Sequence, residues 1–202
     1  LDEPLSNLDA KIRITMRHEI RAIQQRLGLT AIHVTHDREE AMVMADRIVI
    51  MSEGAIVQDG DPETVYRRPN SPFVASFLGA DNAIGVDAAV EDAAQTLTAH
   101  DGTVVGRLMA QQCAGRPLEG PLTVHFRAEA AHLEPADAAP PTGLSLPGEI
   151  TQVAYPGGRY RYSVMTRFGT YLVDQTDRYA VGDRIALSVP AEALHLFADK
   201  RQ

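Results

Sequence analysis

Two adjacent carboxylates and a distant imidazole are the side chains in this sequence best suited to chemistry. Asp2 and Glu3 stand side by side at the start of the chain, and His36 follows a short run rich in β-branched residues, 30–35. Magnesium prefers oxygen ligands such as carboxylates, and a carboxylate can also deprotonate an attacking water. An imidazole can donate a hydrogen bond to a phosphate in either protonation state. These residue types are therefore compatible with phosphoryl transfer.

A long amphipathic helix is expected directly after the carboxylates. Asp9 is a suitable N-cap and Gly28 a suitable stop. Between them, apolar residues recur at spacings of one helix face, namely Ile12, Met16, Ile20, Ile23 and Leu27. The opposite, polar face carries Arg13, Arg17, Arg21 and Arg26. We expect these arginines to be solvated, with docking to a partner surface as the alternative.

The imidazole is expected at the end of a buried strand. The run 30–35 is short and rich in β-branched residues, which predicts a buried strand with His36 at its end. Asp37 with Glu40 three residues later resembles a capping box and predicts a helix to about residue 45. A hairpin is expected over 47–59, and a helix after each of the pairs Asp61-Pro62 and Ser71-Pro72. This order predicts a layered α/β domain.

The second half of the chain has the texture of an all-β module. Short β-type runs are separated by Gly and Pro, which suits a small barrel or sandwich. The stretch 134–148 is expected to be rich in turns. The expected strands are 83–90, 95–98, 104–108, 122–126, 148–155, 159–166, 171–175 and 183–189.

Composition excludes several classes of protein. The 202 residues are 45% hydrophobic and 23% charged, which excludes a mainly disordered chain. The net charge of −8 argues against a broad nucleic-acid footprint. A single cysteine, Cys113, excludes an internal disulfide framework and is expected to be inert. The sequence shows neither an apolar run long enough for a bilayer span nor a signal peptide.

Taken together, the motifs resemble the ATPase subunit of ABC transporters. The segment 1–4 is similar to the tail of the Walker B motif, 6–9 to the D-loop, and His36 to the switch histidine. The resemblance continues through residue 80. In the second half, Arg127-Ala128-Glu129 resembles the Arg-Pro-Glu segment of the accessory β domain of importers, from which Ala128 departs.

This resemblance implies a fold class and a domain division. Residues 1–80 would be the C-terminal part of an α/β nucleotide-binding domain. Residues 81–202 would form an accessory, all-β oligomer-binding-like barrel with a regulatory role. The parent would belong among importers for sugars, polyamines, ferric iron or phosphonates.

The resemblance also implies roles for the motif residues. Asp2 would hold Mg²⁺ through a water, and Glu3 would orient and deprotonate the water that attacks the γ-phosphate of ATP. His36 would contact that phosphate. Asp9 would lie at the dimer interface and link two composite sites.

Partners and location follow from the same resemblance. The cofactors would be ATP and Mg²⁺. The partners would be a second copy, the transmembrane permease subunits and a solute-binding protein, with no nucleic acid. The protein would be cytoplasmic and peripheral on the inner face of the membrane, held by the permease subunits.

Motifs that this chemistry also needs are missing from the sequence. It has no Gly-x-x-x-x-Gly-Lys-Ser/Thr and no Ser-Gly-Gly-Gln signature, and it begins without Met inside a motif. We therefore expect a fragment of a longer protein that binds ATP poorly and does not hydrolyse it alone. Apolar surface on Ile32, Val34, Ile48 and Ile50 should be exposed and favour a dimer. A ligand-sensing β module and a purely dimerising tail remain as alternatives.

Overall fold

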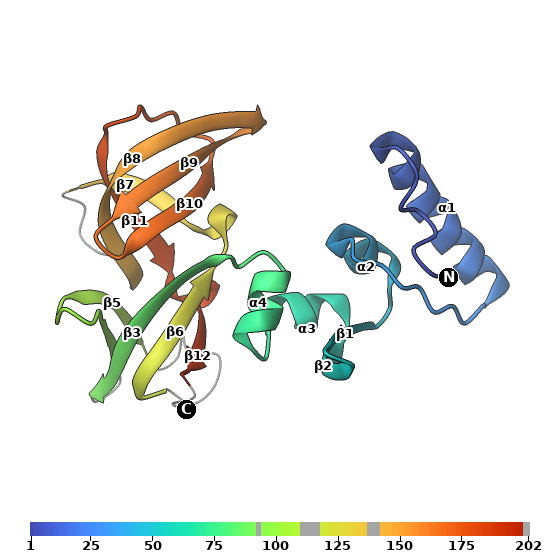
Figure 1. Ribbon diagram of the computed structural model, residues 1–202, viewed down its shortest axis with the longest axis horizontal. Helices are drawn as coiled ribbons and strands as arrows, with labels where there is room; N and C mark the ends of the chain where they lie inside the picture. The colour runs from blue at the N-terminus through green and yellow to red at the C-terminus, as the bar shows by residue number, and fades with distance from the viewer. Residues whose placement is uncertain (92–93, 110–117, 137–141, 200–202) are drawn as a thin grey trace. The chain divides into compact units, whose positions relative to one another are not determined.

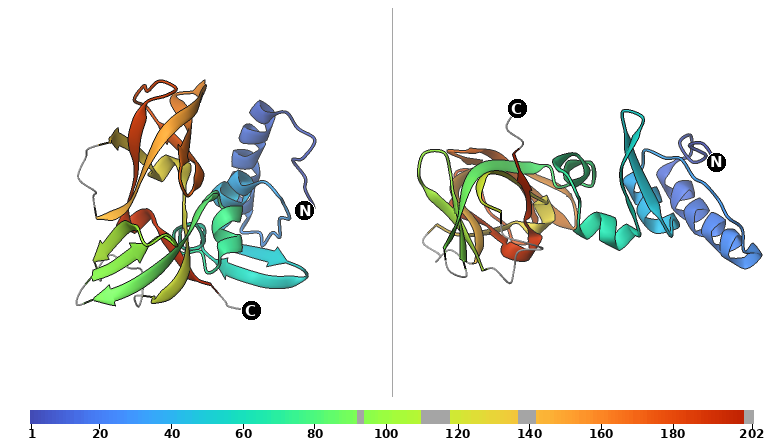
Figure 2. Two further views of the ribbon diagram at one scale, coloured as in Figure 1. Left: turned by 60° about the vertical axis from the view of Figure 1, so that its left-hand side comes forward. Right: turned by 90° about the horizontal axis from the view of Figure 1, so that it is seen from below.

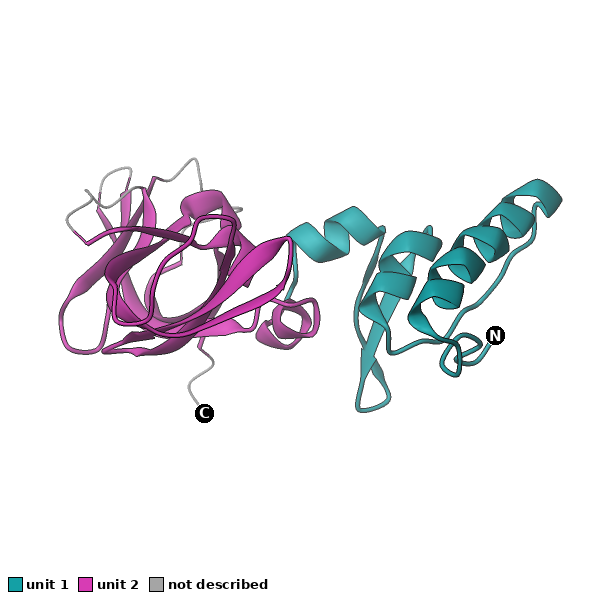
Figure 3. Ribbon diagram, turned by 90° about the horizontal axis from the view of Figure 1, so that it is seen from above, with its two compact units in different colours: residues 1–70 teal, residues 71–202 magenta. Residues whose placement is uncertain are grey.

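The computed structural model describes residues 1–91, 94–109, 118–136 and 142–199. The chain divides by packing into two compact units, 1–70 and 71–202 (Figure 3). Cys113 lies outside the described residues.

The first unit contains the helices and the hairpin that capping and periodicity predict (Figure 1). Asp9 caps the first helix, with its Oδ1 accepting a hydrogen bond from the backbone N–H of Ile12 at 2.9 Å. Gly28 ends it with φ of 61°, a conformation that suits glycine. The elements are α1 (Ala10–Leu27), α2 (Arg38–Met44), β1 (Ile48–Ser52), β2 (Ala55–Gly60) and α3 (Pro62–Arg67).

The buried strand expected over 30–35 does not form. Val34 forms an isolated parallel bridge to Asp2, the carbonyl of Ile32 accepts from the amine of Leu1 at 2.8 Å, and the Ile32 side chain is 79% exposed. Parallel strands are buried when their sheet is covered on both faces, and among the described residues this run is bonded to the short segment 1–3 on one edge. The expected exposure of Ile32 and Val34 is therefore confirmed.

The expected exposure of Ile48 and Ile50 is wrong. Both side chains are buried, at 8% and 5% exposure. β1 pairs with β2 in an antiparallel hairpin, and alternate residues of β1 face opposite sides. The face that carries Ile48 and Ile50 is buried, whereas Val49 and Met51 on the other face are exposed.

The second unit is a short helix followed by an antiparallel β half-barrel (Figures 1 and 2). The main path of the sheet runs in the order β10-β9-β8-β5-β4-β3-β6-β12, and β11 pairs with both β7 and β8. The elements are α4 (Pro72–Phe77), β3 (Asn82–Glu91), β4 (Ala94–Thr98), β5 (Val104–Met109), β6 (Gly120–Phe126), β7 (His132–Pro135), β8 (Gly143–Gly157), β9 (Arg159–Thr166), β10 (Gly169–Gln175), β11 (Arg184–Pro190) and β12 (His195–Ala198). Inward-facing residues such as Val86, Leu122, Leu146 and Val164 form one continuous core.

All eight expected strands are present, but the structure corrects the sequence in two places. β7 and β12 were not expected, because four-residue strands show too little alternation to be recognised. β8 already begins at Gly143, inside the stretch expected to be turns. Pro147 sits within this strand, although proline is uncommon inside sheets.

The residues that follow α4 are tied to the half-barrel. His125 Nδ1 lies 2.9 Å from the carbonyl oxygen of Ala80, and Arg127 Nε donates to the carbonyl of Leu78 at 3.4 Å. Packing thus places the division of the chain between Asn70 and Ser71. The family domains expected at 1–80 and 81–202 stay a prediction. Over the described residues, no helix combines the length and apolar character needed to cross a bilayer.

Candidate functional site

The structure brings Glu3 and His36 together from opposite ends of the first unit's N-terminal segment. His36 Nδ1 lies 2.9 Å from Glu3 Oε1, and both side chains are accessible to solvent. The backbone places them, because Glu3 N–H donates to the carbonyl of Val34 at 2.9 Å and Val34 N–H donates to the carbonyl of Leu1 at 2.9 Å. An exposed carboxylate and an exposed imidazole therefore face solvent as a hydrogen-bonded pair.

Glu3 holds this position with an uncommon backbone conformation. Its φ is 40°, in the left-handed region that residues with a Cβ rarely adopt. The following turn stabilises it, since Ser6 donates to the Glu3 carbonyl through both its backbone N–H at 3.2 Å and its hydroxyl at 3.0 Å. Such strain concentrates at functional positions, where the surrounding structure holds it.

Asp2 and Asp9 occupy different settings. Asp2 lies in the bridge to Val34 with an exposed carboxylate, next to the Glu3–His36 pair. Asp9 is the N-cap of α1, so its carboxylate already serves a structural purpose. The roles of both residues stay predictions.

The carboxylate of Glu3 changes the electrostatics of the His36 imidazole. The hydrogen bond to Glu3 and the negative charge of its carboxylate raise the pKa of the His36 imidazole. The protonated form of His36 is thereby favoured beside Glu3. In that form the imidazole donates from both ring nitrogens, and it can contact Glu3 and an anionic group at the same time.

Sequence reasoning missed a buried ionic network directly behind this pair. Arg17, expected on a solvated helix face, is only 3% exposed. It contacts Asp37 Oδ2 at 2.8 Å and Glu39 Oε2 at 3.0 Å. Burial lowers the pKa of the Arg17 guanidinium, but the hydrogen bond to Glu39 and the nearby carboxylates outweigh it and raise that pKa. The helix pattern gave no signal of this burial, because periodicity does not show what packs against a helix face.

Glu40 departs from the capping box that its position suggested. Its side chain does not return to the Asp37 N–H, which donates instead to Thr35 Oγ1 at 3.0 Å. Glu40 Oε2 accepts from Thr35 Oγ1 at 2.7 Å and lies 3.2 Å from His33 Nε2. Asp37 caps α2 as expected. Its partial burial opposes ionisation, but the backbone N–H of Glu40 and the charge of Arg17 hold its pKa below the usual range.

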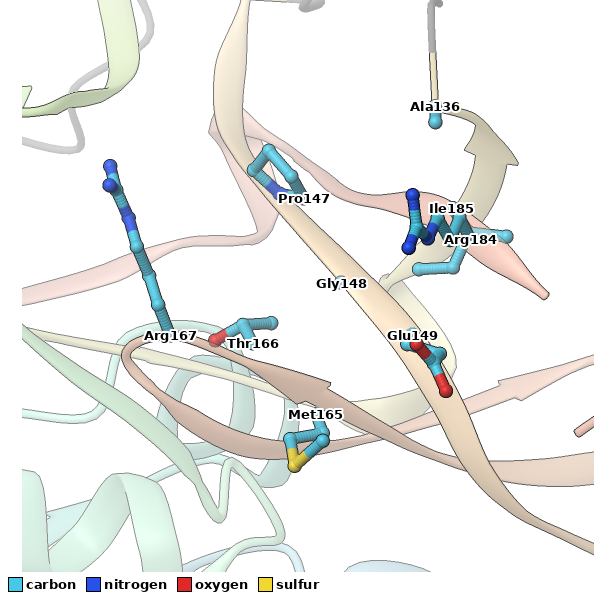
Figure 4. A pocket seen from close by; sticks show the side chains of 9 residues that line it. All are labelled: Ala136, Pro147, Gly148, Glu149, Met165, Thr166, Arg167, Arg184 and Ile185. Atoms are coloured by element: carbon cyan, nitrogen blue, oxygen red, sulfur yellow. The ribbon is translucent and has the colours of Figure 1, made fainter. Parts of the chain in front are cut away.

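The second unit has an open hollow of about 500 Å³ beside β8 (Figure 4). Figure 4 shows Arg167 and Arg184 on opposite sides of the segment that carries Pro147. Arg167 is already engaged within the unit, since it pairs with Asp101 at 3.3 Å and hydrogen-bonds to Thr103. We assign no ligand to this hollow.

Comparison with known proteins connects both units to one kind of protein. Residues 122–197 match the TOBE domain family. The Fe(3+) ions import ATP-binding protein FbpC 1 of Rhizobium meliloti is 42% identical over 86% of this chain and 46% of that protein. The spermidine/putrescine import ATP-binding protein PotA of Ruegeria pomeroyi is 37% identical over 98% of this chain and 54% of that protein.

A solved structure matches more distantly. The cytoplasmic molybdate-binding protein ModG has 9% sequence identity and a TM-score of 0.44, over 57% of this chain and 94% of that one. The chain spans about half the length of the curated relatives it matches. In sequence the chain therefore corresponds to the C-terminal portion of the ATP-binding subunits of ABC importers, and it carries a TOBE domain in its second unit.

Proposed function

We propose that this chain is the C-terminal part of an ATP-hydrolysing importer subunit. The whole protein would energise solute uptake at the cytoplasmic face of the membrane, as a homodimer bound to permease subunits. The names of the relatives support this proposal, since they are import ATP-binding proteins for Fe(3+) ions or for spermidine and putrescine. The solute is chosen by other subunits and stays open.

The contact between Glu3 and His36 carries the proposal. An exposed carboxylate that accepts a hydrogen bond from an imidazole can orient and deprotonate a water, while the imidazole contacts the γ-phosphate. Asp2 fits a magnesium ion, because Mg²⁺ in such sites takes one or two carboxylates and otherwise keeps water and phosphate oxygens. When bound, the ion would neutralise phosphate charge. Asp9 would add the contact to the second copy.

The test is the substitution Glu3→Gln in the complete protein that carries this chain. Removing the base should lower the rate of ATP hydrolysis about 10²- to 10⁴-fold and leave ATP binding intact. Glu19→Gln is the matched control, because Glu19 is exposed on α1. Hydrolysis that persists in Glu3→Gln, or that falls equally in Glu19→Gln, would contradict the proposed role.

The chain alone is expected to show no turnover, since its sequence has no phosphate-binding loop and no signature motif. Hydrolysis of ATP by the purified chain that depends on Glu3 would overturn this expectation. A phosphate-release assay measures the rate of ATP hydrolysis by the purified chain and by the complete protein under the same conditions.

A further inference from the structure

The residues on either side of His36 are held by side-chain hydrogen bonds, whereas the His36 side chain itself is exposed. The imidazole is 74% exposed, and its contact is with Glu3. Thr35, which precedes it, donates its hydroxyl to Glu40 at 2.7 Å and accepts the Asp37 N–H at 3.0 Å. The hydroxyl of Thr35 thus links the Glu40 carboxylate to the backbone N–H of Asp37, the residue after His36.

Asp37, which follows His36, ties the same segment to both helices. Its Oδ1 accepts the backbone N–H groups of Glu39 at 2.9 Å and Glu40 at 3.2 Å at the start of α2. Its Oδ2 accepts from Arg17 at 2.8 Å and from Arg13 at 3.4 Å, both on α1. A single carboxylate therefore fixes the segment against two elements.

Stability alone is a poor explanation for this arrangement. Arg17 and Glu40 are each 3% exposed, and burying charged groups costs desolvation energy that apolar residues in the same place would avoid. Ionic hydrogen bonds are instead directional, so they can hold a loop in one conformation. A site works only when residues behind it hold its reacting groups in place.

We propose that Thr35, Glu40 and Arg17 are positioning residues that hold the backbone of His36 where its imidazole meets Glu3. The hydrogen bonds described above support this positioning. The role of the Glu3–His36 pair in catalysis rests on the proposed function.

The test compares three variants of the chain as it stands. Thr35→Val removes the hydroxyl at nearly constant shape, and Thr35→Ser restores it. Thr15→Val makes the same change at an exposed hydroxyl on α1, which donates to the carbonyl of Lys11 at 3.3 Å. The readout is the nuclear Overhauser contact between the His36 ring and the Glu3 side chain. It is measured at a temperature where circular dichroism shows each variant to be folded.

We expect the contact to weaken about fivefold in Thr35→Val and to persist in Thr35→Ser and Thr15→Val. A structural role alone would lower the unfolding temperature without changing the contact in the folded chain. An unchanged contact in Thr35→Val, an equal loss in Thr35→Ser, or an equal loss in Thr15→Val would each overturn the proposal. So would the absence of the contact in the unaltered chain.

Should Thr35→Val fail to fold, Arg17→Lys decides the question. Lysine keeps the charge but loses the planar fork that reaches two carboxylates, so the contact should again weaken. An undiminished contact in folded Arg17→Lys would overturn the proposal.

A kinetic measurement on the complete protein separates this proposal from the proposed function. There Thr35→Val should lower kcat for ATP hydrolysis about 10-fold or more and change KM for ATP little. If the complete protein does not hydrolyse ATP, the proposed function fails, while the Overhauser contact still decides whether Thr35 positions His36.

Discussion

At the scale of single residues, His195 makes the stability of the half-barrel depend on pH. Burial, the charge of Arg127 and the nearby His125 lower the pKa of His195 to about 4, and Arg127 Nη1 lies 3.0 Å from His195 Nε2. In the unfolded chain, a histidine has a pKa of about 6.5. Between these values the unfolded chain binds a proton that the folded chain rejects. The contribution of neutral His195 to the free energy of unfolding is therefore fully present above about pH 6.5, and it is lost as the pH drops towards 4.

The free energy of unfolding, measured with denaturant from about pH 7.5 to about pH 4.5, tests this dependence. His195→Gln should reduce the pH slope of the unfolding free energy by about one proton in this range. His132→Gln, at an exposed position in β7, makes the same substitution elsewhere in the half-barrel and serves as the control. A slope in His195→Gln equal to that of the unaltered chain would show that His195 is not the titrating group.

Candidate residues could be named from residue types, but the residues that hold them could not. Asp2, Glu3 and His36 are candidates because their motifs are ordered along the sequence, and their chemical roles stay predictions. Arg17 was assigned to solvent because a helix pattern shows which face is polar, not what packs against that face. The burial of a charged side chain depends on partners such as Asp37, which lies on another element.

At the scale of elements, the pairing of β5 with β8 forms a seam in the sheet. It joins the strands β10-β9-β8 to the strands β5-β4-β3-β6-β12. Within the part of the chain that the structure describes, β5 pairs with β8 over two residue pairs, Gly106 with Leu144 and Arg107 with Gly143. A Cβ built on Gly106 would lie 2.5 Å from the carbonyl oxygen of Gly143, a contact with backbone that cannot move aside cheaply. Glycine at this position lets the two strands approach.

Gly106→Ala should therefore lower the free energy of unfolding by about 1–3 kcal/mol. Gly85→Ala on β3 is the matched control, because its Cβ would meet only the ring of His100, a movable side chain, at 3.1 Å. That change should stay within about 0.5 kcal/mol. Thermal and denaturant unfolding of both variants measure the difference, and equal stabilities would refute the importance of the seam.

The elements themselves were largely predictable, whereas their pairing was not. Short β-type runs separated by Gly and Pro identified eight strands. The run 30–35 has the same composition as a buried strand, yet it lacks a sheet to join within this chain. Pattern predicts which residues prefer burial, and the available neighbours decide whether burial occurs.

At the scale of the whole molecule, the two units differ in how much core they possess. In the second unit one cluster of buried residues extends from Ile84 to Leu194. In the first unit the buried apolar side chains are Leu5, Ile48, Ile50 and Val65. Exposed Ile32 and Val34 add apolar surface that the first unit does not cover by itself. Self-association of the chain through this surface stays a prediction of the sequence.

This asymmetry predicts which unit folds independently. Residues 71–202 alone should unfold cooperatively, because their core is contained within the segment. Residues 1–70 alone should lack a cooperative transition, since a segment of this size with few buried side chains gains too little free energy to offset its chain entropy. Thermal circular dichroism and amide NMR spectra of the two segments measure this. A sharp transition in residues 1–70 would mean that the ionic network of Arg17, Asp37 and Glu40 stabilises the first unit without a large apolar core.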